Sequence, residues 1–384
     1  KTEERPVPYK PIRLKPTLHV WTQKRARLET LNALDYSMDG IYDSLGMDAD
    51  EYLMTLRRQH DPYTDLEFLK RDGSTRYISA PNDHLKLLFE SFYKRYLATP
   101  ALFHNSAFAY IRGRSAIQCA RKHENATWLV KIDIENFFHT IDERQVYREF
   151  RKRGVNKFPA FVLARFLTRE PSKFKGALPA KYRRHRGNPA SKLFDVESRR
   201  LGFLPQGSPA SGAVSNLVFF DLDNLMEKLA QDFDVAYSRY SDDLTFSSTK
   251  KFDRPKASKL LERAIRALRA AGFSPHPQKT RIVPPGARKQ LLGVLVGHPG
   301  LRLPRARKKQ IETEIWAVQN LGFRKHAKRV RAQNEFQVLN RLHGTLVWAH
   351  EVDPKWAAPR LESLQAAAEA QLGELAEDGP KSNV

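Results

Sequence analysis

Aspartates at the ends of two β-type segments constrain the fold of this chain most. Residues 128–133 (Trp-Leu-Val-Lys-Ile-Asp) are mostly apolar and predict a buried strand that ends in a carboxylate. Residues 235–248 predict a hairpin with Ser241-Asp242-Asp243 at its tip. Neighbouring strands lie about 4.8 Å apart, so strands that set carboxylates side by side can hold two Mg²⁺ ions about 3.5–4 Å apart. Such hard cations prefer carboxylate oxygens.

The Asp242-Asp243 pair also has a simpler interpretation, because aspartate suits turns and most such pairs are solvated. The flanking segments, 237–240 and 244–246, are strand formers and weigh against it. They place the pair on an ordered tip, where like charges repel and a metal ion would relieve the repulsion. Two such ions commonly catalyse phosphoryl transfer to a nucleotide 3′-hydroxyl. One ion would lower the pKa of the attacking 3′-hydroxyl, and the other would neutralise charge on the triphosphate and on the leaving pyrophosphate.

The formal charge of the chain is +23, from 66 Lys and Arg residues against 43 Asp and Glu residues. Such a charge favours a polyanionic partner, and nucleic acid is the first candidate because neutralising phosphates releases counterions. A membrane surface is the weaker alternative, since no apolar run approaches the roughly 20 residues that span a bilayer.

The single cysteine, Cys119, excludes an intramolecular disulfide and a cysteine-based zinc site. It favours a reducing, intracellular compartment. The N-terminal residues lack an apolar signal core, so secretion is not expected. The 12 histidines are scattered and suggest no metal cluster.

The order of patterns along the chain predicts a mixed α and β protein. We expect a Pro-rich basic arm over about the first 20 residues and a long basic loop at about 170–200. Asp72-Gly73 is a tight-turn signal between two strands within residues 66–81. A further apolar strand is expected at 291–296. Helical patterns cover residues 21–60, 84–97, 209–230, 255–271 and most of 305–372.

Tyr240-Ser241-Asp242-Asp243 matches the Tyr-x-Asp-Asp signature of reverse transcriptases. Other segments resemble further motifs of that family and stand in the same order, so the resemblance spans about residues 65–350. They are the first palm motif (131–138, Lys-Ile-Asp-Ile-Glu-Asn-Phe-Phe), the Gln-Gly motif (204–211, Leu-Pro-Gln-Gly-Ser-Pro-Ala-Ser), a later palm motif (277–280, Pro-Gln-Lys-Thr) and the primer-grip strand (291–296, Leu-Leu-Gly-Val-Leu-Val).

Other segments resemble retron and retron-like, defence-associated reverse transcriptases of bacteria. They are 110–115 (Tyr-Ile-Arg-Gly-Arg-Ser), 136–141 (Asn-Phe-Phe-His-Thr-Ile), and 342–346 (Leu-His-Gly-Thr-Leu) with 352–354 (Val-Asp-Pro). Two segments depart from the retron pattern. Residues 119–123 keep only the Ala and His of an Asn-Ala-x-x-His element, and Leu-Leu-Gly at 291–293 replaces Val-Thr-Gly. The sequence is therefore consistent both with a true retron reverse transcriptase and with another defence-associated reverse transcriptase.

The resemblance implies an α+β right-hand polymerase with fingers, a palm of antiparallel sheet and helices, and a helical thumb. The expected parts are an N-terminal arm and helical extension (1–60), fingers (61–125), palm (126–290, with the basic insertion at about 170–200), and primer grip with basic thumb (291–384). It implies RNA-templated DNA synthesis from dNTPs with two Mg²⁺ ions, or Mn²⁺, in the bacterial cytoplasm. A dedicated non-coding RNA is the expected template, in an anti-phage defence system. No membrane is expected; an effector protein or a second copy is a further candidate partner.

The resemblance also implies roles for single residues. Asp133, Asp242 and Asp243 are the expected catalytic residues, and together with Ile134 they form the expected metal site. Phe138 would exclude a 2′-hydroxyl, although one of the two adjacent phenylalanines is expected in the core.

Four further residues are expected to bind the incoming nucleotide. Gln206-Gly207 would lie against template and nucleotide, with a backbone approach that only glycine tolerates, unless it is a plain loop. Arg76 would clamp the triphosphate and Lys279 would lie near the leaving phosphates, unless both are solvated surface residues.

Basic residues are expected to contact nucleic acid. Arg112 and Arg114 would meet the template backbone, with a surface salt bridge as the alternative. Tyr240 belongs to the same expected interface. The basic thumb residues would track duplex phosphates unless they are solvated helix faces; they are Arg305, Arg307, Lys308, Arg324, Lys325, Lys328 and Arg329.

Three rival functions remain. An RNA-dependent RNA polymerase would share the palm, but Phe138 argues against it. An intron-encoded maturase would usually carry a longer extension than the residues after Leu372 provide. A catalytically silent RNA-binding scaffold is disfavoured by the intact aspartates.

Overall fold

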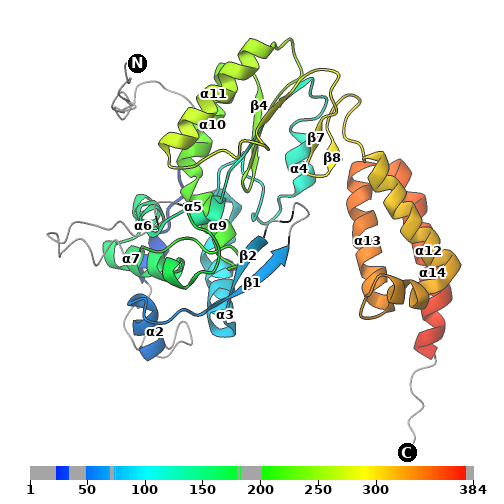
Figure 1. The fold of residues 1–384 in the computed structure, drawn as a ribbon, viewed down its shortest axis with the longest axis horizontal. Helices are drawn as coiled ribbons and strands as arrows, with labels where there is room; N and C mark the ends of the chain where they lie inside the picture. The colour runs from blue at the N-terminus through cyan, green and yellow to red at the C-terminus, as the bar shows by residue number, and fades with distance from the viewer. Residues whose placement is uncertain are drawn as a thin grey trace, which may run out of the picture. The chain divides into compact units, whose positions relative to one another are not determined.

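The computed structural model describes residues 23–33, 49–69, 73, 75–179, 182 and 201–377. The expected N-terminal arm and most of the expected basic loop at 170–200 lie outside these residues. The described chain forms two compact units (Figure 1). The first contains the described residues up to Ser115, Val130–Phe246 and Phe252–Ile282. The second contains Ala116–Leu129, Ser247–Lys251 and the described residues from Val283 onward.

The early part of the chain combines short helices with one β-hairpin. Strands β1 (Tyr63–Leu69) and β2 (Thr75–Pro81) are antiparallel and pair from Tyr63 with Pro81 to Leu69 with Thr75. This confirms the two strands expected around Asp72-Gly73, although Asp72 itself is not described. The neighbouring elements are η1 (Glu29–Ala33), α2 (Ala49–Leu56), α3 (Asp83–Phe92), the π-helical turn η2 (Tyr93–Leu97) and η3 (Pro100–Leu102).

A four-stranded sheet with the order β4-β5-β3-β6 forms the centre of the site. Its strands are β3 (Trp128–Asp133), β4 (Ala236–Tyr240), β5 (Asp243–Ser248) and β6 (Arg281–Val283). The apolar run of β3 is buried at every position except one, as a strand covered on both faces requires. The sequence predictions for β3 and for the β4–β5 hairpin are confirmed.

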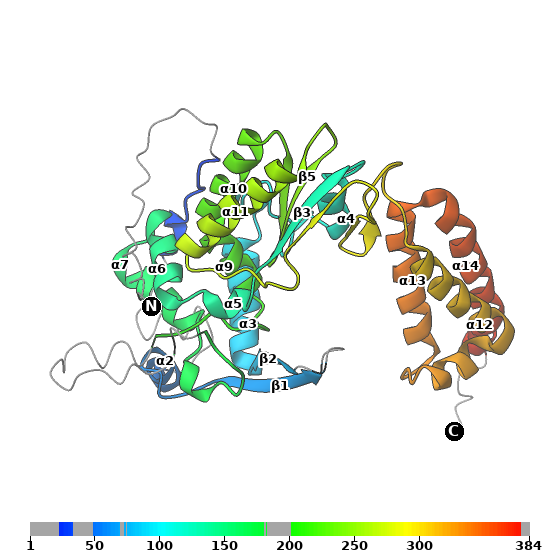
Figure 2. The same ribbon diagram turned by 45° about the horizontal axis from the view of Figure 1, so that its top comes forward.

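Helices α10 and α11 lie next to this sheet, as Figure 2 shows for β3 and β5. Helix α10 packs on β4, and α10 and α11 lie side by side in both views. The helices of this part are α5 (Phe137–Thr140), α6 (Glu143–Lys152), α7 (Lys157–Phe166), η4 (Pro171–Lys173), α9 (Ser211–Val218), α10 (Phe220–Asp232) and α11 (Arg254–Ala270).

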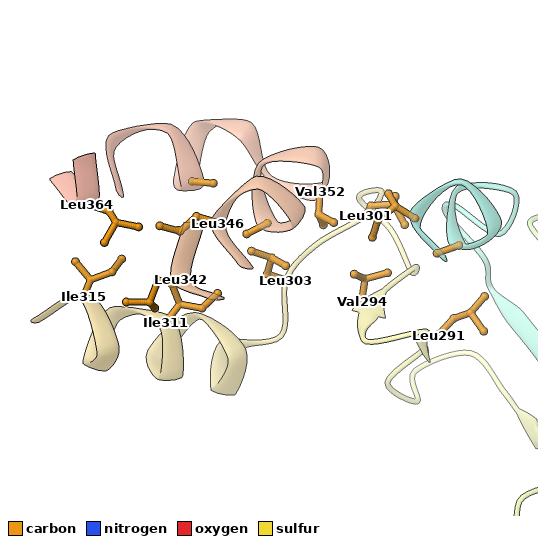
Figure 3. Close-up of a cluster of buried hydrophobic side chains, with 14 of the residues drawn as sticks. Leu291, Val294, Leu301, Leu303, Ile311, Ile315, Leu342, Leu346, Val352 and Leu364 are labelled. Carbon is orange, nitrogen blue, oxygen red and sulfur yellow. The ribbon is translucent and has the colours of Figure 1, made fainter. Parts of the chain in front are cut away.

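The second unit is mainly helical, and its core is drawn in Figure 3. Ile311, Ile315, Leu342, Leu346 and Leu364 point toward one another from three helices. These helices are α12 (Arg305–Arg329), α13 (Glu335–Val352) and α14 (Pro354–Glu377), which confirm the helical pattern expected there. The unit also contains α4 (Ala116–Arg121). Among the described helices, none combines the length and the hydropathy that spanning a bilayer requires.

Three expected elements differ from the structure. The strand expected at 291–296 is instead a hairpin of β7 (Gln290–Leu291) and β8 (Val294–Leu295). Leu292 and Gly293 turn the chain with φ of 48° and 88°, a reversal that an apolar run does not reveal. The helix expected at 209–230 is divided into α9 and α10 at Phe219. Within 21–60, the described residues form η1 and α2 rather than one helix.

Candidate active site

The end of β3 and the β4–β5 turn lie against each other. Asp133 is the last residue of β3, and the next residue, Ile134, donates its backbone N–H to the carbonyl oxygen of Asp242 at 3.0 Å. Asp242 lies in the turn and Asp243 begins β5. The structure therefore brings together the three aspartates that the sequence singled out, although more than a hundred residues separate Asp133 from the other two.

The carboxylates of the β4–β5 turn are only partly accessible. Burial raises the pKa of Asp242 above its usual value, and repulsion from Asp133 adds to the rise. Burial likewise raises the pKa of Asp243, with Asp242 and Asp133 adding to it, while the ammonium of Lys131 opposes the rise. A negative charge on one carboxylate thus makes ionisation of the neighbouring carboxyl groups less favourable, and a bound cation would relieve this repulsion.

Lys279 supplies a cation to this cluster. Its Nζ donates to both carboxylate oxygens of Asp133, at 3.2 Å each. The segment carrying Lys279 is fixed beside β3, since His276 donates its backbone N–H to the Asp133 carbonyl oxygen at 2.7 Å. Lys279 is expected near leaving phosphates; in this structure its ammonium lies at the Asp133 carboxylate, and its contact with phosphates stays a prediction.

The aspartates suit a divalent cation by the chemistry of their donors. Their oxygens are the ligands that Mg²⁺ prefers, and burial, with repulsion between the aspartates as a further cause, raises the pKa of Asp242 and of Asp243. Within the described residues, no three His, Cys, Asp or Glu side chains converge as a ready metal site. In this structure the carboxylate of Asp133 is engaged by the ammonium of Lys279.

Phe137 and Phe138 divide into a core residue and a half-exposed one. Phe137 is buried against Phe219 and Phe273. Phe138 is half-buried, and its ring centroid lies 5.9 Å from that of Tyr110. The two residues begin the short helix α5. The side chains of Phe137 and Phe138 therefore point in different directions because they lie on a helical turn and not because they alternate along a strand.

The backbone at Gly207 lies too close to β2 for any side chain. Its φ is +129°, and a Cβ atom built there would lie 2.6 Å from the Ser79 carbonyl oxygen. Next to it, the Gln206 carbonyl oxygen accepts from the Ser79 N–H at 2.7 Å. The close approach predicted for Gly207 is therefore present, and its partner in this structure is the strand β2.

The arginines expected at the nucleic acid have different surroundings. Arg76 on β2 and Arg112 are exposed. Arg114 is half-buried and its Nη1 donates to the backbone carbonyl oxygens of His104 and Ala107. Arg114 thus braces its own loop, which sequence reasoning did not anticipate.

The basic residues of α12 fall into two groups. Arg305, Arg324, Lys325, Lys328 and Arg329 are exposed. Lys308 instead donates to Asp353 at 2.6 Å and lies over the Trp356 ring, and Arg307 lies over the Trp348 ring. Lys308 and Arg307 therefore stabilise the helical core in addition to any contact with nucleic acid.

A buried ion pair behind the turn was missed by sequence reasoning. Arg239 on β4 and Asp223 on α10 are both fully buried and joined by two hydrogen bonds. Ser241, in the turn itself, has a left-handed φ of 59°, and its hydroxyl oxygen lies 3.3 Å from that of Tyr110. An arginine within a run of strand formers before an acidic turn was the available signal.

Comparison with known proteins agrees with these observations. Residues 68–324 match the family described as reverse transcriptase (RNA-dependent DNA polymerase). The chain is 30% identical over 355 residues to the retron Mx162 reverse transcriptase of Myxococcus xanthus, covering 86% of this chain and 67% of that one. It is 28% identical over 240 residues to the retron Mx65 reverse transcriptase of the same organism, covering 61% and 51%.

Among solved structures, a telomerase from Candida albicans in complex with a telomeric RNA fragment superposes with a TM-score of 0.42. The identity is 10%, with 86% of this chain and 67% of that chain covered. The chain spans two thirds of the Mx162 relative and about half of the Mx65 relative.

Proposed function

The chain belongs to the reverse transcriptase family of RNA-directed DNA polymerases and is of the retron type, and on that premise we propose that Asp133, Asp242 and Asp243 are its catalytic carboxylates. The proposal rests on one observation, the backbone bond from Ile134 to Asp242 that sets the turn against the end of β3. The α+β fold is that of a right-hand polymerase.

The three aspartates, with Ile134 beside them, would hold two Mg²⁺ ions, for which Mn²⁺ can substitute. Bound there, the ions would supply Lewis-acid activation of a primer 3′-hydroxyl and neutralise charge on the triphosphate. The chain's own part is to hold the carboxylates in place before substrate arrives, which is catalysis by positioning. Lys279 would leave Asp133 for the phosphates of the nucleotide, because both are anionic acceptors for one ammonium.

The nucleotide would lie between β2 and the end of the sheet that carries the three aspartates. Gln206-Gly207, fixed on Ser79, supports the proposed contact with template and incoming base. Arg76, exposed on β2, would bind the triphosphate through its guanidinium. Phe138 would lie under the sugar and exclude a 2′-hydroxyl, which its half-exposed ring supports.

The remaining assignments follow the family. Residues 61–125 would form the fingers, 126–290 the palm, and 291–384 the primer grip and thumb. The exposed arginines and lysines of α12 (Arg305, Arg324, Lys325, Lys328 and Arg329) would contact phosphates of the primer–template duplex, with Arg112 and Tyr240 nearer the template.

We also propose that the template is a dedicated non-coding RNA and that the enzyme acts in bacterial anti-phage defence, with an effector protein as a partner. The retron reverse transcriptases among its relatives support this proposal. Sequencing the nucleic acid that co-purifies with the protein tests it. Recovery of one recurrent RNA joined to complementary DNA is expected, and a random mixture of cellular RNA would contradict it.

Primer extension on an RNA template tests the chemistry. Asp242→Asn should reduce the rate by at least about 10²-fold, because a preorganised charge in the transition state is lost. Asp232→Asn removes an exposed aspartate of α10 and should leave the rate unchanged. Chelating divalent ions should stop the wild-type reaction. Undiminished extension by Asp242→Asn would refute the assignment.

The choice of sugar needs a second measurement. Phe138→Ala should raise ribonucleotide incorporation relative to deoxyribonucleotide incorporation by about 10- to 200-fold, because a pocket that loses apolar bulk loses that much discrimination. Phe138→Tyr keeps the ring and should keep the wild-type ratio. An unchanged ratio in Phe138→Ala would place the gate elsewhere.

A further inference from the structure

Arg239, the fully buried arginine that precedes the β4–β5 turn, has several described residues around its guanidinium group. Arg239 Nε and Nη2 donate to the two carboxylate oxygens of Asp223 at 2.9 and 2.6 Å. Its Nη1 donates to Asn216 Oδ1 at 2.9 Å, and the guanidinium carbon lies 4.4 Å from the centroid of the Phe219 ring. A permanently charged group is thus held in one orientation.

The same Nη1 also donates to the carbonyl oxygen of Ser241 at 3.1 Å. Ser241 immediately precedes the aspartates and has a left-handed φ of 59°, which a non-glycine residue adopts at a cost. The bond from Arg239 fixes the peptide that follows this conformation. That peptide links Ser241 to Asp242.

The backbone of Arg239 is anchored as well. Its N–H donates to the Ser106 carbonyl oxygen at 2.7 Å, and its own carbonyl oxygen accepts from the Phe108 N–H at 2.9 Å. Asn216 Nδ2 donates to the Ala109 carbonyl oxygen at 2.8 Å, so the same loop also holds the residue that orients Nη1. Helices α9 and α10, the loop 106–109 and strand β4 are therefore all linked through Arg239, the helices by its side chain and the loop by its backbone.

We propose that Arg239, oriented by Asp223 and Asn216, is a positioning residue that holds the β4–β5 turn so that Asp242 and Asp243 lie opposite Asp133. The inference rests on the proposed function of these aspartates. A guanidinium is needed because its planar fork engages a carboxylate with one edge and leaves a further N–H for the turn. An ammonium offers no such fixed geometry.

Arg239→Lys keeps the charge and the partner Asp223 but not the fork. Tyr237→Phe is the matched control, because Tyr237 lies two residues earlier on β4, is equally buried and donates to the same Asp223 oxygen at 2.8 Å. That hydroxyl bond joins β4 to α10 and does not involve the turn. Asn216→Ala is a second variant, which leaves the ion pair intact and removes the acceptor that orients Nη1, together with the bond to the Ala109 carbonyl oxygen.

Two readouts separate positioning from a general loss of stability. In primer extension below the unfolding temperature, Arg239→Lys and Asn216→Ala should lower kcat at least about tenfold with the dNTP KM within about twofold of wild type. Tyr237→Phe should keep both constants. In hydrogen exchange, amides of the segment 236–248 should exchange faster in Arg239→Lys and Asn216→Ala than in Tyr237→Phe.

The outcomes are distinct. A wild-type chain that does not extend primers would refute the proposed polymerase function, and the exchange comparison would still decide the role of Arg239. Exchange in segment 236–248 that matches Tyr237→Phe would overturn the positioning role. Failure of both Arg239→Lys and Asn216→Ala to fold would also overturn it, because Arg239 and Asn216 would then serve the core and not the turn.

Discussion

At the scale of single residues, Gly207 shows how closely two backbones approach near the site. The space beside its Cα atom is filled by the Ser79 carbonyl oxygen and the Ile78 side chain. Its conformation lies at φ +129°, which L side chains rarely adopt. The residue therefore meets two separate obstacles to substitution, a collision and an unfavourable backbone conformation.

Gly207→Ala should lower the free energy of unfolding by more than conformational strain alone, which is about 1–3 kcal/mol. Gly286→Ala is the control, since Gly286 also has a positive φ of 80° but no atom within 4 Å of a built Cβ. Chemical denaturation of both variants measures the difference. Equal destabilisation of the two proteins would show that the Ser79 carbonyl moves aside without cost.

His139 is buried beside Phe174 and Phe203, with centroid distances of 5.0 and 5.2 Å. Burial lowers its pKa to about 4, and the positive charge of Arg169 adds to the effect. The unfolded chain binds a proton at this residue below about pH 6.5, whereas the native imidazole does so only below about pH 4. The stability of the native state therefore falls as the pH drops through this window.

His139→Phe should remove this part of the pH dependence, at most about 3 kcal/mol between pH 6.5 and pH 4. The phenyl ring suits the aromatic surroundings and carries no titratable group. Denaturation midpoints measured across that range should give a shallower slope than wild type. His84→Gln, at an exposed position, should keep the wild-type slope, and a His139→Phe slope equal to wild type would contradict the argument.

The sequence alone identified the residues that belong to a short motif of known chemistry. The strand patterns and the order of the family motifs predicted that Asp133, Asp242 and Asp243 lie together, as they do in the structure. The buried pair of Arg239 and Asp223 was not predicted, since an arginine in a strand is usually exposed and its partner lies in a separate element, the helix α10. The sequence did not indicate the contact of Lys279 with Asp133, because a lysine within a motif does not show which carboxylate lies nearest in the fold.

At the scale of elements, Arg169 ties the β1–β2 hairpin to the segment before Gly207. Its side chain donates to Asp61, Asp65 and the Ser79 hydroxyl. Its backbone pairs with Phe203 in both directions, at 2.8 and 2.9 Å. One buried residue thus joins both strands of the hairpin to the chain that leads into the Gln-Gly motif.

Arg169→Gln should cost about 3–5 kcal/mol of unfolding free energy, because removing one partner leaves buried carboxylates uncompensated. Arg266→Gln removes an exposed arginine that pairs with Glu262 on α11 and should cost at most about 0.5 kcal/mol. Urea denaturation compares the two. A cost below about 1 kcal/mol in Arg169→Gln would mean that Asp61 and Asp65 find other partners or water.

Long, strongly patterned elements were predictable and short turns were not. Helix α11, strand β3 and the β4–β5 hairpin match their expected ranges, since each has its own hydrophobic period or turn signal. The β7–β8 hairpin was read as one strand because Leu291, the turn residue Leu292 and strand β8 are all apolar. Chain reversal there depends on a left-handed leucine, which no local rule favours.

At the scale of the whole molecule, the charge of +23 favours binding of nucleic acid through its phosphates. Each phosphate neutralised on a duplex releases condensed counterions, so affinity falls steeply with salt. Not every basic residue contributes, because Lys308, Arg169 and Arg239 are already paired inside the protein.

Replacing Arg324, Lys325, Lys328 and Arg329 with glutamine should reduce the slope of log Kd against log salt by about one for each phosphate that is no longer neutralised. Titration of an RNA·DNA duplex by fluorescence anisotropy over a range of KCl measures the slope. Lys256→Gln with Lys259→Gln removes exposed charge from α11 as the control. A slope that falls equally in both variants would show diffuse attraction and no specific role for α12.

The sheet order β4-β5-β3-β6 has a consequence for the protein's biosynthesis. Strand β3 leaves the ribosome first, and both of its neighbours, β5 and β6, are encoded more than a hundred residues later. At about 5–20 residues per second, the nascent strand waits roughly 5–20 s with both edges open. Its apolar residues are then a target for chaperones, and translation speed through this stretch should influence the yield of active enzyme.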